Sequence, residues 1–208
     1  MPQSTNTRGL IWDMGGVLVR NMDPTIRGRL AEPYGMTYRD LEDLFFGNEM
    51  AYKASIGQAS EADSWEFVRR KLNLRPADMP AFIAAFWSCD RFDEDLYAFT
   101  MALKPRVKVG LLSNAYAETR ASLQQRFPHF YDMFDVTIFS AEVKMVKPDP
   151  RIYQLALEEL GVLPQDAVFV DDFIENVEAA RALGLDGIHF RDSQQARSEI
   201  LTFLGNSS

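Results

Sequence analysis

The amino-acid sequence predicts an α/β fold: a doubly wound, Rossmann-like parallel sheet with a small helical cap domain inserted after the first strand. Three observations support this prediction. Short apolar runs bounded by polar or glycine residues recur along the chain, helical patterns lie between them, and about seventy residues near the N-terminus lack strand-like runs. Alternation of strands and helices is typical of a parallel sheet with helices on both faces.

Five apolar runs have the length and composition of buried strands. They are Gly9–Trp12, Val107–Leu112, Val136–Phe139, Ala167–Val170 and Gly187–Phe190. Two clear helical patterns lie between the later runs. Asp149 before Pro150 is a typical helix start and Gly161 a typical helix end, while a second helix over 174–183 is expected to stop at Gly184.

A helical insert is expected between residues 21 and 90, where strand-like runs are absent. Amphipathic stretches predict four helices there, at Thr25–Tyr34, Tyr38–Phe46, Ser60–Leu72 and Asp78–Ser88, with Thr37 and Ser60 as candidate N-caps. An insert of this length is too long for a loop and suits a small four-helix cap. We therefore expect an α/β core formed by residues 1–20 and 91–208 and a cap formed by residues 21–90.

The composition excludes two classes of partner. The 208 residues include 22 Lys and Arg against 30 Asp and Glu, a formal net charge of −8, whereas nucleic-acid binding depends on basic residues that neutralise phosphates. No apolar run approaches the ~18 residues of a membrane-spanning helix, so no membrane partner is expected. The lone cysteine, Cys89, cannot form an intrachain disulfide, and residues 1–8 lack the apolar core of a signal peptide. Both observations favour a cytoplasmic location.

Polar residues follow four of the expected strands. In open parallel α/β sheets, ligands bind at the carboxyl ends of the strands, where these residues would meet. The set comprises Asp13, Gly15 and Gly16 after the first strand, Ser113 and Asn114 after the second, Lys147 after the third, and Asp171, Asp172 and Asn176 after the fourth. Folding does not require three carboxylates, a hydroxyl, amides and an ammonium at one sheet edge, so their convergence predicts a site.

Most of these residues, taken alone, also have a structural explanation. Asp13 suits a turn or a helix N-cap, Ser113 suits the cap of the following helix, and Lys147 suits a solvated surface. The pair Asp171–Asp172 is different, because adjacent carboxylates at the end of a buried strand repel each other unless a cation is present. The pair therefore predicts a metal site.

In this order the residues resemble the motifs of the haloacid-dehalogenase-like (HAD) hydrolase superfamily, along essentially the whole chain. The motifs are Ile11-Trp12-Asp13-Met14-Gly15-Gly16-Val17-Leu18, then Ser113-Asn114, then Val146-Lys147-Pro148-Asp149-Pro150, and finally Asp171-Asp172. The stretch from Phe169 to Ala180 is most similar to one subgroup, which holds bacterial sugar-phosphate phosphatases and the phosphatase domain fused to some epoxide hydrolases. A helical insert after the first motif is the type-one cap of that family.

The resemblance implies Mg²⁺-dependent hydrolysis of a small phosphomonoester, such as a sugar phosphate. Asp13 would be the nucleophile that attacks phosphorus and forms an aspartyl-phosphate. The Mg²⁺ ligands would be the Asp13 carboxylate, the Gly15 backbone carbonyl and Asp172, while Asp171 and Asn176 would surround this set without binding the ion directly.

The resemblance also implies how the substrate is held. Ser113, the Asn114 amide and Lys147 would bind the phosphoryl oxygens, and Lys147 would offset the repulsion between Asp13 and the incoming anion.

Substrate choice is expected to lie in the cap, which would close over the site. Tyr52 and Lys53 are candidate contacts to a sugar or a second phosphate. Arg20, close after the first motif, is a candidate contact to an anionic substrate.

One position departs from the family pattern. Most phosphatases of the family carry a second Asp two residues after the nucleophile, as general acid and base, and here that residue is Gly15. Loss of a positioned acid typically costs ~10²–10⁴ in rate. Three explanations stay open: the leaving group needs little help, as in sugar-1-phosphates; another group such as Asp23, or the substrate, supplies the proton; or the protein is a regulatory or binding protein that holds a phosphorylated ligand without catalysis.

A metal-independent 2-haloacid dehalogenase is a further alternative, since that branch of the family also lacks the second Asp. The pair Asp171–Asp172 argues against it because the pair favours Mg²⁺. The residues after Asp13 also lack the Tyr-Gly-Thr run expected after a dehalogenase nucleophile.

Overall fold

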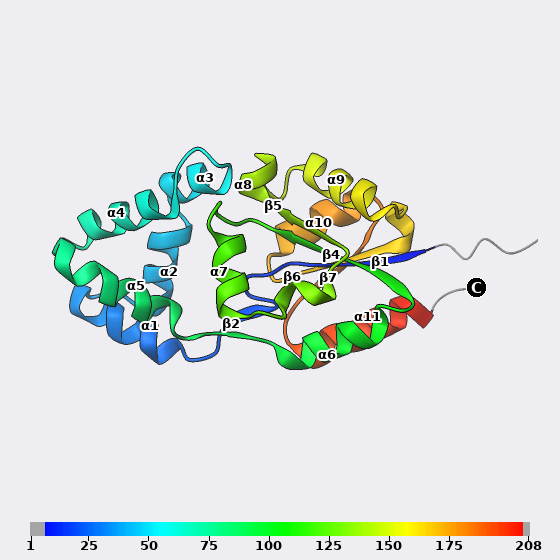
Figure 1. The fold of residues 1–208 in the computed structure, drawn as a ribbon, viewed down its shortest axis with the longest axis horizontal. Coiled ribbons are helices and arrows are strands. Elements are labelled where there is room, and N and C mark those ends of the chain that lie inside the picture. Colours follow the sequence, from blue (N-terminus) through cyan, green and yellow to red (C-terminus); the bar gives the residue numbers. More distant parts are fainter. Residues whose placement is uncertain (1–6, 206–208) are drawn as a thin grey trace, which may run out of the picture.

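A five-stranded parallel sheet with the order β5-β4-β1-β6-β7 forms the centre of the molecule (Figure 1). The computed structural model describes residues 7–205, so the ends of the expected core at 1–6 and 206–208 lie outside the described residues. The strands are β1 (Arg8–Trp12), β4 (Val107–Ser113), β5 (Val136–Phe139), β6 (Ala167–Asp171) and β7 (Asp186–His189). All five predicted strands are confirmed, each boundary within one residue.

Helices cover both faces of the sheet, which confirms the doubly wound α/β fold. Leu10 and Trp12 of β1 pack in one apolar cluster with α6 (Glu94–Leu103) and α11 (Ser193–Gly205). Ile11, between them in sequence, packs in a second cluster with α9 (Pro150–Leu160) and α10 (Ile174–Ala182). In Figure 1 the first helix pair lies below the sheet and the second pair lies above it. Successive side chains of a strand point to opposite faces, so one apolar run supplies both clusters.

The helix signals around the third and fourth strands are confirmed. The Asp149 side chain accepts the backbone N–H of Arg151 at 3.0 Å and caps α9, and Gly161 ends α9 in the left-handed conformation at φ 66°. Gly184, at φ 90°, follows α10. These turns bring the chain back to the sheet after each helix.

The cap contains five α-helices within residues 21–90, all of which are described, so the expectation of four was wrong. They are α1 (Pro24–Ala31), α2 (Tyr38–Phe46), α3 (Glu49–Ser55), α4 (Glu61–Lys71) and α5 (Met79–Trp87). The additional helix, α3, begins at Asn48, whose side chain accepts the N–H of Ala51 at 3.0 Å and donates to the carbonyl of Leu44 at 2.7 Å. One short polar side chain thus ends α2 and starts α3 within an apolar run. The predicted N-caps Thr37 and Ser60 are confirmed, and both form reciprocal capping boxes.

A two-stranded antiparallel ribbon connects the cap to the core. It pairs β2 (Val19–Asn21) with β3 (Asp90–Phe92). Arg20 in this ribbon forms an ion pair with Asp93 and donates to Ser193 Oγ at 3.1 Å, at the start of α11. We propose that the core–cap boundaries lie in this ribbon, after residues 20 and 90.

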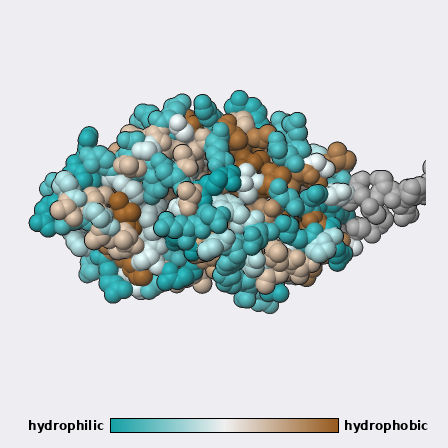
Figure 2. Space-filling view, in the orientation of Figure 1, coloured by the Kyte–Doolittle hydropathy of each residue, from teal (hydrophilic) through white to brown (hydrophobic). Residues whose placement is uncertain are grey.

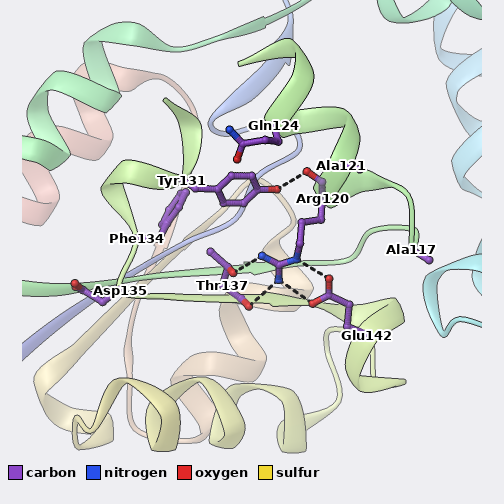
Figure 3. Close-up of a pocket in the computed structure, with 9 residues that line it drawn as sticks. All are labelled: Ala117, Arg120, Ala121, Gln124, Tyr131, Phe134, Asp135, Thr137 and Glu142. Carbon is purple, nitrogen blue, oxygen red and sulfur yellow. Dashed lines mark hydrogen bonds and ion pairs between the residues drawn. The ribbon is translucent and has the colours of Figure 1, made fainter. Parts of the chain in front are cut away.

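The β5 edge of the sheet is covered by a charged side chain. Arg120 of α7 (Thr119–Arg126) donates to Thr137 Oγ1 at 2.8 Å and to Glu142 of α8 (Ser140–Val143) at 2.7 Å, as Figure 3 shows. An ion pair laid across an edge strand protects it from pairing with another strand. The groove drawn in Figure 3, of about 680 Å³, lies beside Arg120 and includes none of the acidic residues at the carboxyl ends of β1 and β6.

The outer surface is mostly hydrophilic in the view of Figure 2, with apolar residues gathered over the region of β5 and α9. Among residues 7–205, no helix combines the length and the apolar character that a membrane crossing requires.

Candidate active site

Three carboxylates meet at the carboxyl ends of β1 and β6, as the sequence predicts. Asp13 directly follows β1 and its N–H donates to the carbonyl of Val170 at 2.9 Å, while Asp171 ends β6 and Asp172 follows. One oxygen from each of these three acids lies within 4.8 Å of the others. Asp13 is 6% exposed and Asp171 is fully buried, so their charges are held in a poorly solvated place.

Lys147 lies inside this acidic cluster. Its ammonium donates to Asp13 Oδ1 at 2.5 Å and to Asp171 Oδ2 at 2.6 Å. Asp171 also accepts the Phe173 N–H at 2.8 Å and the Asn176 side-chain amide at 3.1 Å. The lysine therefore fixes the Asp13 carboxylate from one side, and Asn176 fixes Asp171 from the other.

Asn114 holds the backbone of Lys147. Its side-chain oxygen accepts the Lys147 N–H at 2.8 Å, and its side-chain nitrogen donates to the Lys147 carbonyl at 3.0 Å. Ser113, the last residue of β4, is 1% exposed. The structure thus gives the Asn114 side chain a partner that the sequence did not predict, namely the backbone of Lys147.

The two glycines after Asp13 differ in their surroundings. A Cβ on Gly16, which has a φ of +76°, would lie 2.1 Å from Asp172 Oδ2, so only glycine fits against that carboxylate. A Cβ on Gly15 would meet nothing within 4 Å. The position where most relatives of the resembled family carry a second Asp therefore has open space in front of it.

Burial disfavours the charged form of the acids. Burial raises the pKa of Asp13 above its ordinary value, the Lys147 ammonium opposes the shift, and the charges of Asp171 and Asp172 add to it. Burial, followed by the charge of Asp171, raises the pKa of Asp172 to about 6. For Lys147, burial lowers the pKa, but the carboxylates of Asp13 and Asp171 outweigh it, so the pKa is raised and the amine stays protonated.

The donor set fits a hard divalent cation. The buried Asp172 Oδ1 has no hydrogen-bond partner among the described residues, although buried carboxylate oxygens are normally paired. Carboxylate and backbone carbonyl oxygens are the ligands that Mg²⁺ prefers. Asp13, Asp172 and the Gly15 carbonyl could therefore hold such an ion, with Asp171 and Asn176 behind them.

Two of the three predicted substrate contacts are engaged with partners outside the acidic cluster in this structure. Arg20 is engaged with Asp93 and Ser193, and Lys53 pairs with Glu49 on the same helix at 2.7 Å. Tyr52 is 56% exposed on α3. Asp23, the alternative proton donor, caps α1 by accepting the Thr25 N–H at 3.1 Å.

Sequence reasoning missed Tyr116, two residues after Asn114. It is 7% exposed and belongs to the apolar cluster of the cap, not to that of the core. An aromatic residue two positions after the second motif was the available signal, but only the fold shows where its ring lies.

The fold and the site define an α/β enzyme with a buried carboxylate–lysine centre at the carboxyl edge of a doubly wound sheet. The family model described as "Hydrolase: haloacid dehalogenase-like hydrolase" matches residues 7–184. The chain belongs to this family, which confirms the resemblance seen in its motifs.

Similar proteins include named phosphatases. The sesquiterpene phosphatase astK of Aspergillus oryzae is 27% identical over 205 residues, which cover 97% of this chain and 98% of that protein. The bifunctional epoxide hydrolase 2 of Rattus norvegicus is 37% identical over 84 residues, 40% of this chain but only 15% of that much longer protein. The chain is thus a HAD-like hydrolase that is similar to a named phosphatase along nearly its whole length.

A solved structure has the same fold. A HAD family enzyme from Bacteroides thetaiotaomicron, in complex with magnesium and inorganic phosphate, superposes with a TM-score of 0.74 at 24% identity. The match covers 90% of this chain and 96% of that one.

Proposed function

We propose that the protein hydrolyses a small phosphomonoester through an aspartyl-phosphate on Asp13 and depends on Mg²⁺. The observation that supports this most directly is the position of Lys147, whose ammonium contacts both Asp13 and Asp171. A cation there holds the Asp13 carboxylate in place and reduces its repulsion of an incoming phosphate dianion. The phosphatase relative that matches nearly the whole chain supports the same reaction.

In the first step a carboxylate oxygen of Asp13 attacks phosphorus while the bond from phosphorus to the leaving oxygen breaks. Ser113 and the backbone N–H of Asn114 donate hydrogen bonds to the phosphoryl oxygens, and Lys147 balances part of their charge. The leaving alkoxide takes a proton from solvent, because Gly15 offers no acid.

In the second step water attacks the phosphorus of the aspartyl-phosphate. The bond from phosphorus to Asp13 breaks, which releases inorganic phosphate and restores the carboxylate. When bound by Asp13, Asp172 and the Gly15 carbonyl, Mg²⁺ supplies positive charge that offsets the charge on the phosphoryl oxygens. Asp172 Oδ1, which has no hydrogen-bond partner within residues 7–205, supports its binding there.

Two substrate classes merit a screen. The first is sugar phosphates, sugar-1-phosphates among them, whose anomeric leaving groups need less protonation. The second is phosphates of apolar alcohols, because the nearly full-length relative is named a sesquiterpene phosphatase and Phe173, directly after Asp172, is 61% exposed.

The test uses p-nitrophenyl phosphate, whose leaving group needs little protonation. We expect turnover that requires Mg²⁺ and falls by at least about 10³-fold in Asp13→Asn. Asp186→Asn, an exposed site on β7, is the matched control and should retain full activity. Absence of Mg²⁺-dependent turnover, or full turnover in Asp13→Asn, would overturn the proposal.

The same preparations separate the alternatives. Chloride release from 2-chloropropionate without added metal would support the dehalogenase instead. Phosphate binding without turnover of any phosphomonoester in the screen would support a non-catalytic binding protein.

A further inference from the structure

The loop after β4 contacts the sheet, the lysine and the cap within four residues. Ser113 ends the strand and Asn114 holds the backbone of Lys147. The Ala115 N–H donates to Ser140 Oγ at 2.9 Å, and the Ser140 hydroxyl donates back to the Ala115 carbonyl at 3.2 Å. Tyr116, the next residue, leaves the core and enters the cap.

Tyr116 completes the apolar interior of the cap. Its ring lies 5.8 Å from that of Phe45, centroid to centroid, in an edge-to-face arrangement at 71°. Its hydroxyl donates to the Phe45 carbonyl at 3.5 Å, the outer limit of a hydrogen bond. Burial raises the pKa of Tyr116 well above its ordinary value, which agrees with its position in an apolar cluster. A side chain from the core part of the sequence thus forms part of the apolar interior of the cap.

Further contacts between this side of the core and the cap involve α7 and α8. The backbone at Gly57, in the turn after α3, is so close to α8 that a Cβ would lie 2.6 Å from the Ala141 carbonyl oxygen. The Glu61 N–H, at the start of α4, donates to the Glu118 carboxylate at 3.3 Å. Figure 3 shows Arg120 bound to Glu142, which ties α7 to α8.

We propose that Tyr116 is a positioning residue that couples closure of the cap to the order of the loop that holds Ser113 and Asn114. This inference rests on the proposed function, in which that loop binds the phosphoryl group. A substrate enters when the cap moves away, and any such movement must withdraw Tyr116 from the cap cluster or pull the loop with it. The loop is therefore ordered for phosphate binding in the closed state and loosened in the open one.

The phosphate-binding test compares three variants in the full-length protein. Tyr116→Ala removes the ring, Tyr116→Phe keeps it and removes the hydroxyl, and Phe82→Ala removes a buried cap aromatic whose ring contact is with Trp65. We expect Tyr116→Ala to raise the KM for p-nitrophenyl phosphate and the inhibition constant of inorganic phosphate about 10-fold or more. Tyr116→Phe and Phe82→Ala should leave both constants within about twofold, although Phe82→Ala lowers the melting temperature.

Hydrogen exchange gives a readout that does not require turnover. In Tyr116→Ala the amides of residues 113–118 should exchange at least about 10-fold faster than in the wild type, while those of β1 are unchanged. If Tyr116→Ala fails to fold, Tyr116→Leu, which refills the space without a ring, should show the same change to a smaller degree.

Two outcomes would overturn the inference. One is wild-type exchange in the loop of a folded Tyr116→Ala or Tyr116→Leu; the other is equal loosening of the loop in Phe82→Ala. If the wild type shows no phosphatase activity but the loop exchanges faster in Tyr116→Ala, the proposed function is overturned and the coupling is upheld.

Discussion

The ammonium of Lys147 lies 2.5 Å from Asp13 Oδ1, so the proposed nucleophile and the only lysine of the cluster form a buried ion pair. With Asp171 and Asp172 ionised as well, three carboxylates and one ammonium leave two negative charges uncompensated in a poorly solvated place. A divalent cation neutralises that excess. The site of an acidic protein with net charge −8 can thus attract a metal and accept a phosphate together.

Introducing an acid at residue 15 should accelerate hydrolysis of substrates with poor leaving groups. Gly15→Asp places a carboxyl where a Cβ meets nothing within 4 Å, and it leaves the backbone carbonyl that is proposed to bind Mg²⁺. We expect kcat/KM for a simple alkyl phosphate to rise by about 10²-fold, the lower end of general acid catalysis.

The matched measurement is p-nitrophenyl phosphate, for which the gain should be below about threefold. Gly15→Asn, similar in size but without an acidic proton, is the control and should give no gain with either substrate. An equal gain with both substrates would contradict an acid role.

The sheet and its acids were predictable because their signals are local. Each strand is a short apolar run, and the parallel topology alone brings Asp13 and Asp171 to one edge. The glycine that ends α9 and the capping boxes of Thr37 and Ser60 are equally local. Neighbouring residues in the sequence are therefore enough to predict these features, without knowledge of any long-range contact.

Features that depend on long-range packing were not predictable. Helix α3 begins in an apolar run because Asn48 caps it. One capping residue is too weak a sequence signal to predict that a new helix starts there. The Arg20 side chain contacts Asp93 and Ser193, which are 73 and 173 residues away in the sequence, so these partners could not be predicted from its position after the first motif. The placement of Tyr116 in the cap is likewise a property of the folded chain.

A methyl group at residue 16 should weaken metal binding. In Gly16→Ala the Cβ would lie 2.1 Å from Asp172 Oδ2, so the carboxylate must move away from the site. We expect the concentration of Mg²⁺ that gives half-maximal activity to rise at least about 10-fold.

The control is Gly161→Ala, since Gly161 has a similar φ of +66° and nothing within 4 Å of its Cβ. Both variants suffer the same backbone strain, of about 1 kcal/mol, but only Gly16→Ala meets the carboxylate. A similar loss of Mg²⁺ affinity in Gly161→Ala would assign the effect to strain alone.

Stabilisation by Mg²⁺ should grow with pH. The pKa of Asp172 is raised to about 6 from an ordinary value of 3.8, and the pKa of Asp13 is raised too. Between about pH 4 and 6 the folded protein therefore holds protons that the unfolded chain has lost. Without metal, these acids therefore reduce the stability of the fold as pH rises from about 4 through 6. Bound Mg²⁺ requires the ionised form and counteracts the loss.

The melting temperature with and without 10 mM Mg²⁺, measured from pH 5 to pH 8, checks this dependence. The shift should be small at pH 5 and largest at pH 8, where Mg²⁺ at about a hundred times its Kd would add about 2.7 kcal/mol. In Asp172→Asn the shift should be absent or greatly reduced. A shift in the wild type that does not change with pH would contradict the assigned site.

Removal of a buried arginine should destabilise the cap without touching the acidic cluster. Arg27, 4% exposed, donates to Glu42 at 2.5 Å and to Asp90 at 2.8 Å, and its guanidinium lies 4.1 Å from the centroid of the Phe86 ring. Arg27→Met keeps much of the side-chain volume but leaves Asp90, which is 8% exposed, without its cation. Loss of one partner from a buried pair typically costs about 3–5 kcal/mol, which urea unfolding would measure. The control is Arg70→Met, which removes an exposed partner of Glu66 and should lower the free energy of unfolding by less than about 1 kcal/mol. An equally small decrease in Arg27→Met would contradict the prediction and show that water reaches Asp90.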